Sequence, residues 1–111
     1  MDITMNPEHI GGKLVRDKIP SIIMQGGKKP VYHKASEDEY RTKLLDKLVE
    51  EVAEFSSDPS EEELADIFEV INAIINQFGF DIENIKEMKM AKREERGRFI
   101  EKLILDSVMD D

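Results

Sequence analysis

Two pairs of carboxylates, Glu51 with Glu54 and Glu63 with Asp66, are the residues best suited by type and spacing to chemistry. The members of each pair are three residues apart, so on a helix they project to the same side. Clustered carboxylate oxygens suit Mg²⁺ or Mn²⁺, and a bound ion keeps coordination positions for water and phosphate oxygens. The spacing therefore predicts a divalent-metal site, provided that the helices carrying the two pairs pack together.

The position of these acids among apolar residues strengthens that interpretation. At about 100° per residue, Glu51 falls roughly 20° from Tyr40, inside an apolar stripe, and Glu54 falls at the edge of the stripe. Glu63 lies at the edge of the apolar face of the next segment. An ionised carboxylate buried there needs a cation, a hydrogen-bonding network or a raised pKa. The alternative is that acidic residues, of which the chain has 25, simply form solvated helix faces.

Basic side chains that suit phosphate lie in two segments. Lys13, Arg16 and Lys18 fall in one short loop-like stretch, and Arg16 is the best bidentate donor among them. Lys92 and Arg96 are four residues apart and share a helix face. The alternatives are an ordinary solvated basic patch for the first group and surface ion pairs with neighbouring glutamates for the second.

Two helices are predicted to position the carboxylates. The segment 36–55 opens with a Ser-x-x-Glu capping box and carries apolar side chains at three- and four-residue steps. The segment 60–78 opens in the same way, carries a broader apolar face and stops at Gly79. The short connection between them demands a tight turn and predicts an antiparallel helical hairpin.

The rest of the chain is predicted to complete a single all-α domain, residues 1–111. Its N-terminal arm, 1–35, is broken up by glycine and proline and holds one short helix near 17–24. A third main helix is predicted over 81–96, ended by Gly97. The apolar tail 99–108 fits helix or strand by periodicity, and we expect a helix. Because a domain of this size buries a modest fraction of its surface, we expect partner chains to complete the core.

Composition excludes several classes of function. The net charge of -9 argues against binding to long nucleic acids, which requires clustered Lys and Arg. The absence of cysteine excludes disulfides, thiolate nucleophiles and zinc–thiolate sites. No apolar stretch approaches the roughly 18 residues that span a bilayer, and the N-terminus does not read as a signal peptide. We therefore expect a cytoplasmic protein with no membrane partner.

With these motifs in place, the sequence resembles the MazG-like, or phosphoribosyl-ATP pyrophosphohydrolase-like, superfamily of all-α nucleotide pyrophosphatases over nearly its whole length. Glu50-Glu51-x-x-Glu54 followed by Glu63-x-x-Asp66 is similar to the family's EExxE…ExxD signature, whose carboxylates hold Mg²⁺. By resemblance, four of these acids would be metal ligands, with Glu50 supporting them. The four are Glu51, Glu54, Glu63 and Asp66.

Two further segments resemble elements of one subgroup of small, single-domain members. They are 13–20 and Lys92-x-x-x-Arg96-Gly97-x-Phe99. The resemblance implies a homodimer or homotetramer in which helices form a four-helix bundle. It also implies hydrolysis of a nucleoside triphosphate, or a related nucleotide, to the monophosphate and pyrophosphate.

The predicted mechanism follows from a metal-bound water of lowered pKa that attacks phosphorus. Glu50 or Glu54 would accept its proton, and the basic side chains would offset charge on the phosphates. Two alternatives stay open. One is a non-enzymatic helical module that oligomerises or binds a regulatory ion, and the other is hydrolysis of phosphoribosyl-ATP in histidine biosynthesis.

Overall fold

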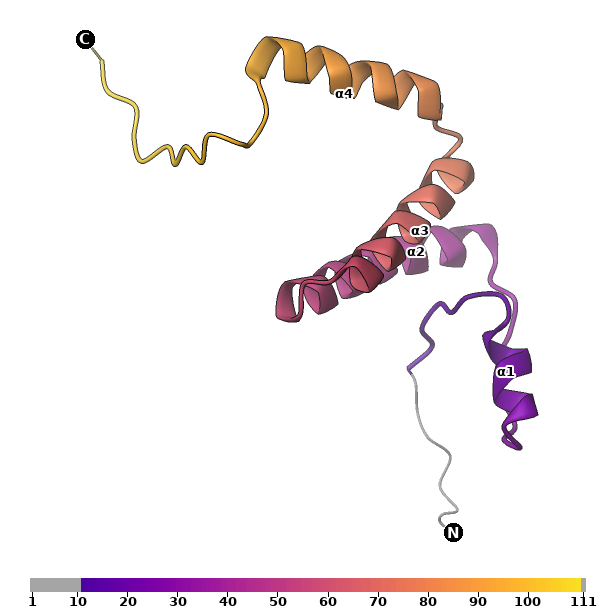
Figure 1. Cartoon of the computed structure of the whole chain (residues 1–111). Helices are drawn as coiled ribbons and strands as arrows, with labels where there is room; N and C mark the ends of the chain where they lie inside the picture. Colours follow the sequence, from indigo (N-terminus) through magenta and orange to yellow (C-terminus); the bar gives the residue numbers. More distant parts are fainter. Residues whose placement is uncertain (1–10, 111) are drawn as a thin grey trace. The chain divides into compact units, whose positions relative to one another are not determined.

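In the computed structural model the described residues, 11–110, are all-helical and contain no strand (Figure 1). The helices are α1 (Ile19–Gln25), α2 (Glu37–Ser57), α3 (Glu61–Phe78) and α4 (Ile82–Arg96). The chain divides into two compact units, the first ending at Gly79 and the second beginning at Phe80. The all-α prediction is confirmed, and the first ten residues of the predicted arm lie outside the described part.

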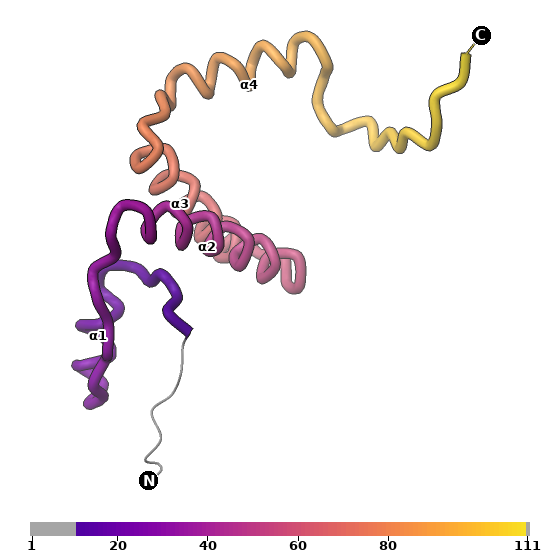
Figure 2. The backbone as a smooth tube through the Cα atoms, turned by 180° about the vertical axis from the view of Figure 1, so that it is seen from behind, coloured from indigo at the N-terminus to yellow at the C-terminus, as the bar shows by residue number. Residues whose placement is uncertain are grey.

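The α2–α3 hairpin is the centre of the first unit, and the two helices pack side by side (Figure 2). Its bounds follow from the sequence signals, because Ser36 and Ser60 are the N-caps and Gly79 ends α3 in the left-handed conformation. Leu44, from α2, and Val70, from α3, are the buried apolar residues of the described chain.

Each predicted capping box forms only one of its two hydrogen bonds, the one that the serine accepts. The Ser36 and Ser60 hydroxyls accept from the backbone N–H of Glu39 and Glu63, at 3.2 and 3.1 Å. The glutamate side chains, however, do not return to the caps. The Glu39 carboxylate contacts His33 Nε2 at 3.0 Å, and Glu63 Oε2 is buried without a hydrogen-bond partner. The carboxylate of Glu63 lies instead with those of Glu51 and Asp66.

The short N-terminal helix α1 begins two residues later than predicted and is preceded by an extended loop that reaches α2 and α3. Pro20 lies in its first turn, where the missing N–H costs no hydrogen bond. The backbone of Ile19 still donates to the Arg16 carbonyl, at 3.0 Å, which closes a turn just before the helix. This turn places the Lys13–Arg16 stretch beside the hairpin.

The second unit consists of α4 and the tail. The Asp81 side chain caps α4 by accepting from the backbone N–H of Glu83 and Asn84. The prediction of a helix over 99–108 is wrong, since the described residues after Gly97 form only a turn and irregular chain. Phe99 is 99% exposed, and Lys102 has a φ of 60°, which interrupts a helix. A short apolar segment without a core to pack on has too little to stabilise a helix.

The hairpin leaves large apolar side chains exposed. Val49 and Phe68 are 71% and 64% exposed, and Leu45, Val52 and Ile71 are partly exposed, at 38 to 48%. None of the helices of residues 11–110 has the length and apolar content needed to cross a membrane. Among the described residues, the hairpin thus exposes more large apolar side chains than it buries.

Candidate metal centre

Glu51 stands at the junction of two groups of carboxylates. In the first group, carboxylate oxygens of Glu50, Glu51 and Glu54 all lie within 4.8 Å of one another, and in the second those of Glu51, Glu63 and Asp66 do so. The first group comes from successive turns of α2, and the second joins α2 to α3. The hairpin therefore brings the two sequence pairs together, across the short connection that the sequence predicted to need a tight turn.

The carboxyl of Glu51 is buried, with 6% of the residue exposed. Burial, followed by its hydrogen bond and electrostatic repulsion with Glu54, raises the pKa of Glu51 to about 7, and the charge of Asp66 adds to this. Lys47 opposes the shift but does not cancel it. At neutral pH the Glu51 carboxyl is therefore either protonated, or ionised without enough positive charge nearby to balance it.

Glu63 shows the same need for positive charge from the opposite helix. Its Oε2 atom is buried and has no hydrogen-bond partner. Burial first, and then the negative charges of Glu54 and Asp66, raise the pKa of Glu63. A buried acceptor without a donor costs free energy comparable to a lost hydrogen bond.

These two observations test whether the site fits a divalent cation. A purely solvated acidic face would have exposed, hydrated oxygens, whereas Glu51 and Glu63 Oε2 are withdrawn from water beside other acids. A cation among these oxygens would give Glu63 Oε2 a partner and offset the repulsion around Glu51. The donor set consists entirely of carboxylates, which suits Mg²⁺ or Mn²⁺. The residues present thus fit such an ion.

The N-terminal loop brings two of the predicted phosphate-binding cations to these carboxylates. Arg16 Nη2 lies 2.8 Å from Asp66 Oδ1, and Lys13 Nζ lies 3.4 Å from Glu50 Oε2. The side chains of both cations are more than half exposed to solvent. Exposed cations held beside these carboxylates are available to bind an anion.

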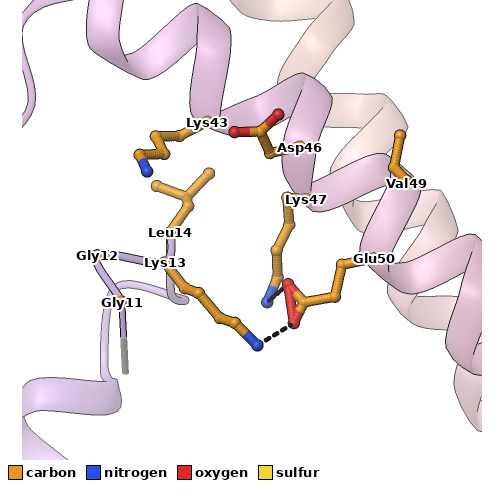
Figure 3. Close-up of a pocket in the computed structure, with 9 residues that line it drawn as sticks. All are labelled: Gly11, Gly12, Lys13, Leu14, Lys43, Asp46, Lys47, Val49 and Glu50. Atoms are coloured by element: carbon orange, nitrogen blue, oxygen red, sulfur yellow. Dashed lines mark hydrogen bonds and ion pairs between the residues drawn. The ribbon is translucent and has the colours of Figure 1, made fainter. Parts of the chain in front are cut away.

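Glu50 differs from the other acids of the centre because two lysines hold it. Lys47 Nζ approaches its Oε1 at 3.3 Å, while Lys13 approaches its Oε2 (Figure 3). Burial alone would raise the pKa of Glu50, but the hydrogen bonds and charges of Lys47 and Lys13 outweigh it and lower the pKa. Sequence reasoning missed Lys47, although its three-residue spacing from Glu50 was a usable signal.

The other three cations predicted to bind phosphate make no ion pair with these carboxylates among residues 11–110. They are Lys18, Lys92 and Arg96. Lys18 is exposed beside the start of α1 and makes no ion pair with any of residues 11–110. Lys92 and Arg96 belong to the second unit, where they line a hollow at the end of α4 together with Arg93, Arg98 and Phe99. Their predicted role at phosphate stays a prediction.

Comparison with known proteins gives little further information. No model of a known family matches the chain, and no solved structure matches it. An uncharacterized protein of Mycolicibacterium smegmatis is 52% identical over 42 residues, which make up 38% of this chain and 43% of that protein. The chain thus spans less than half of this relative's length.

Proposed function

We propose that this chain is a divalent-metal-dependent nucleotide pyrophosphohydrolase of the MazG-like type. The observation that carries the proposal is the convergence of buried Glu51 with the unpartnered Glu63 Oε2 across the hairpin. The similarity of the acidic motifs to the EExxE…ExxD signature supports it. The substrate is a nucleoside triphosphate or a related nucleotide, and the products are the monophosphate and pyrophosphate.

Glu51, Glu54, Glu63 and Asp66 would hold Mg²⁺, with Mn²⁺ as a substitute. The ion supplies a water of lowered pKa and offsets charge on the phosphates. Among the chain's own groups, Glu54 is better suited than Glu50 to accept the proton of that water. Glu54 is exposed, whereas Glu50 is held by two lysines that lower its pKa and make it a weaker base.

The overall step is a hydrolysis. The water oxygen bonds to phosphorus, the bond from that phosphorus to the bridging oxygen breaks, and pyrophosphate leaves while the carboxylate takes the water's proton. Arg16 and Lys13 are placed to bind phosphate oxygens beside the acids. Binding there would draw the Arg16 guanidinium from Asp66 toward the substrate and leave that carboxylate free for the ion.

A second copy of the chain is part of the proposal. Two hairpins that pack through their exposed apolar side chains, Val49 and Phe68 among them, would form a four-helix bundle and complete the core. This assembly gives a homodimer, and the association of two such dimers gives a homotetramer. A cytoplasmic setting belongs to the same proposal, since the chain has no cysteine and its substrate is a metabolite.

The test is pyrophosphate release from a panel of nucleotides that includes phosphoribosyl-ATP, with and without Mg²⁺. Release should require the ion and should fall by at least about tenfold in Glu51→Gln, because even residues that only support metal ligands typically contribute about 10- to 100-fold to activity. Glu69→Gln, at an exposed acid of α3 outside both carboxylate groups, is the matched control. Tight Mg²⁺ binding without release from any nucleotide would indicate the regulatory metal-binding module instead.

A further inference from the structure

A hollow of about 390 Å³ lies between the N-terminal loop and α2, next to the carboxylates (Figure 3). Residues 11–14 form one wall, and the side chains of Lys43, Lys47 and Glu50 from α2 form much of the other. The proposed reaction uses only Lys13 and Glu50 from the lining of this hollow. Lys43, from α2, has no role in the steps described above.

The hollow gathers more cations than acids in a chain of net charge -9. Lys13, Lys43 and Lys47 line it, against Asp46 and Glu50. Two of the lysines share the single carboxylate of Glu50. Lys43 is half-buried and makes no ion pair within the described part of the chain. A lysine ammonium group that no ion pair neutralises is a favourable partner for an anion.

The loop leaves the approach to Lys43 open. Gly12 has a φ of 68°, in the left-handed region that favours glycine, and a Cβ built there would lie 3.9 Å from Lys43 Nζ. No side chain of residue 11 or 12 therefore stands between the loop backbone and the lysine head.

Glu50 joins the hollow to the metal centre. It lines the hollow, and its carboxylate oxygen also lies within 4.8 Å of oxygens of Glu51 and Glu54. A chain of phosphates held at the carboxylates would continue past Glu50 into this space. Ammonium groups suit a phosphate there far better than an uncharged ribose or nucleobase.

We propose that the hollow binds the terminal phosphate of a nucleoside triphosphate and makes the enzyme prefer triphosphates to diphosphates. Lys43 is the specificity-determining residue, with Lys13 and Lys47 beside it. This inference rests on the proposed function and deepens it, since it names which end of the nucleotide occupies which side of the carboxylates.

The test compares kcat/KM for a nucleoside triphosphate and the matching diphosphate in the full chain with Mg²⁺. Lys43→Gln should lower the value for the triphosphate about tenfold or more, which is the loss of one hydrogen bond to a charged group. The value for the diphosphate should change less than about twofold, and Lys43→Arg should restore most of the preference. Lys29→Gln, at an exposed lysine outside the hollow, is the control.

Calorimetric binding of inorganic tripolyphosphate with Mg²⁺ separates this inference from the proposed function. Equal use of both nucleotides by the wild type, or an equal loss on both in Lys43→Gln, overturns the inference and leaves the pyrophosphohydrolase standing. If no nucleotide is cleaved, the proposed function fails. Binding that weakens at least about fivefold in Lys43→Gln, and not in Lys29→Gln, then supports the anion-binding hollow, and unchanged binding overturns it.

Discussion

Replacing Glu51 by glutamine should stabilise the chain in the absence of Mg²⁺, and Mg²⁺ should remove most of that advantage. The folded chain raises the pKa of this carboxyl from 4.5 to about 7. Since one pKa unit corresponds to about 1.36 kcal/mol, the buried ionised group costs up to about 3 kcal/mol above pH 7 in the absence of metal. Glutamine keeps the size of the side chain but carries no charge, so it removes this cost.

The sign of the pH dependence follows from proton binding. Between pH 4.5 and about 7 the folded state keeps the Glu51 proton that the unfolded chain has released. The free energy of unfolding therefore falls as pH rises through this window, by the contribution of this one group. Glu51→Gln should lose that contribution while other ionisable groups keep theirs.

The assay is urea unfolding followed by circular dichroism at pH 8, in EDTA and then in Mg²⁺. In EDTA, Glu51→Gln should be more stable than the wild type by up to about 3 kcal/mol. With Mg²⁺ at 100 times its Kd, the wild type should gain about 2.7 kcal/mol and the variant far less. The exposed Glu69→Gln should follow the wild type under both conditions.

Two results would refute the reasoning. A Glu51→Gln protein no more stable than the wild type in EDTA at pH 8 would show that burial does not penalise the charge. A variant that gains as much stability from Mg²⁺ as the wild type would remove Glu51 from the metal centre.

Three further predictions concern other parts of the first unit. Arg16→Gln should cost less than about 1 kcal/mol of stability, because its ion pair with Asp66 is exposed, yet should raise KM in pyrophosphate release at least about tenfold; an unchanged KM would exclude Arg16 from phosphate binding. Ser60→Ala should lower the free energy of unfolding by about 1 kcal/mol in urea titrations, since the hydroxyl caps α3; no change would mean that the cap is dispensable. Phe68→Glu should shift the chain toward monomer in sedimentation experiments, because it places charge on the exposed apolar surface; an unaltered oligomer would place the interface elsewhere.

Local signals in the sequence were sufficient to predict the hairpin. Serine caps, apolar periodicity and Gly79 act within one or two helical turns, so the predicted segments 36–55 and 60–78 match α2 and α3 within a few residues. The same signals predict that the carboxylates converge. Acids three residues apart project from one side of their helix, and a short connection allows the two helices to pack with these sides facing each other.

Features that depend on distant contacts could not be predicted in the same way. The hollow at Lys43 exists because the glycine loop lies against α2, and nothing in either segment alone specifies that contact. Glu39 contacts His33 and not its own helix end, since a partner outside the helix competes for the carboxylate. The prediction of a helix in the tail was wrong because a contact is missing. Apolar periodicity leads to a helix only where a core exists for the apolar face to pack on.

The division of the chain at Gly79 has a consequence for the design of shortened variants. All four predicted metal ligands, and the hollow beside them, lie before this glycine, whereas α4 and the tail follow it. A chain that ends at Gly79 would keep all of these groups and would lose Lys92 and Arg96, the two cations predicted on α4. The boundary therefore separates the acids of the predicted site from the basic side chains that α4 carries.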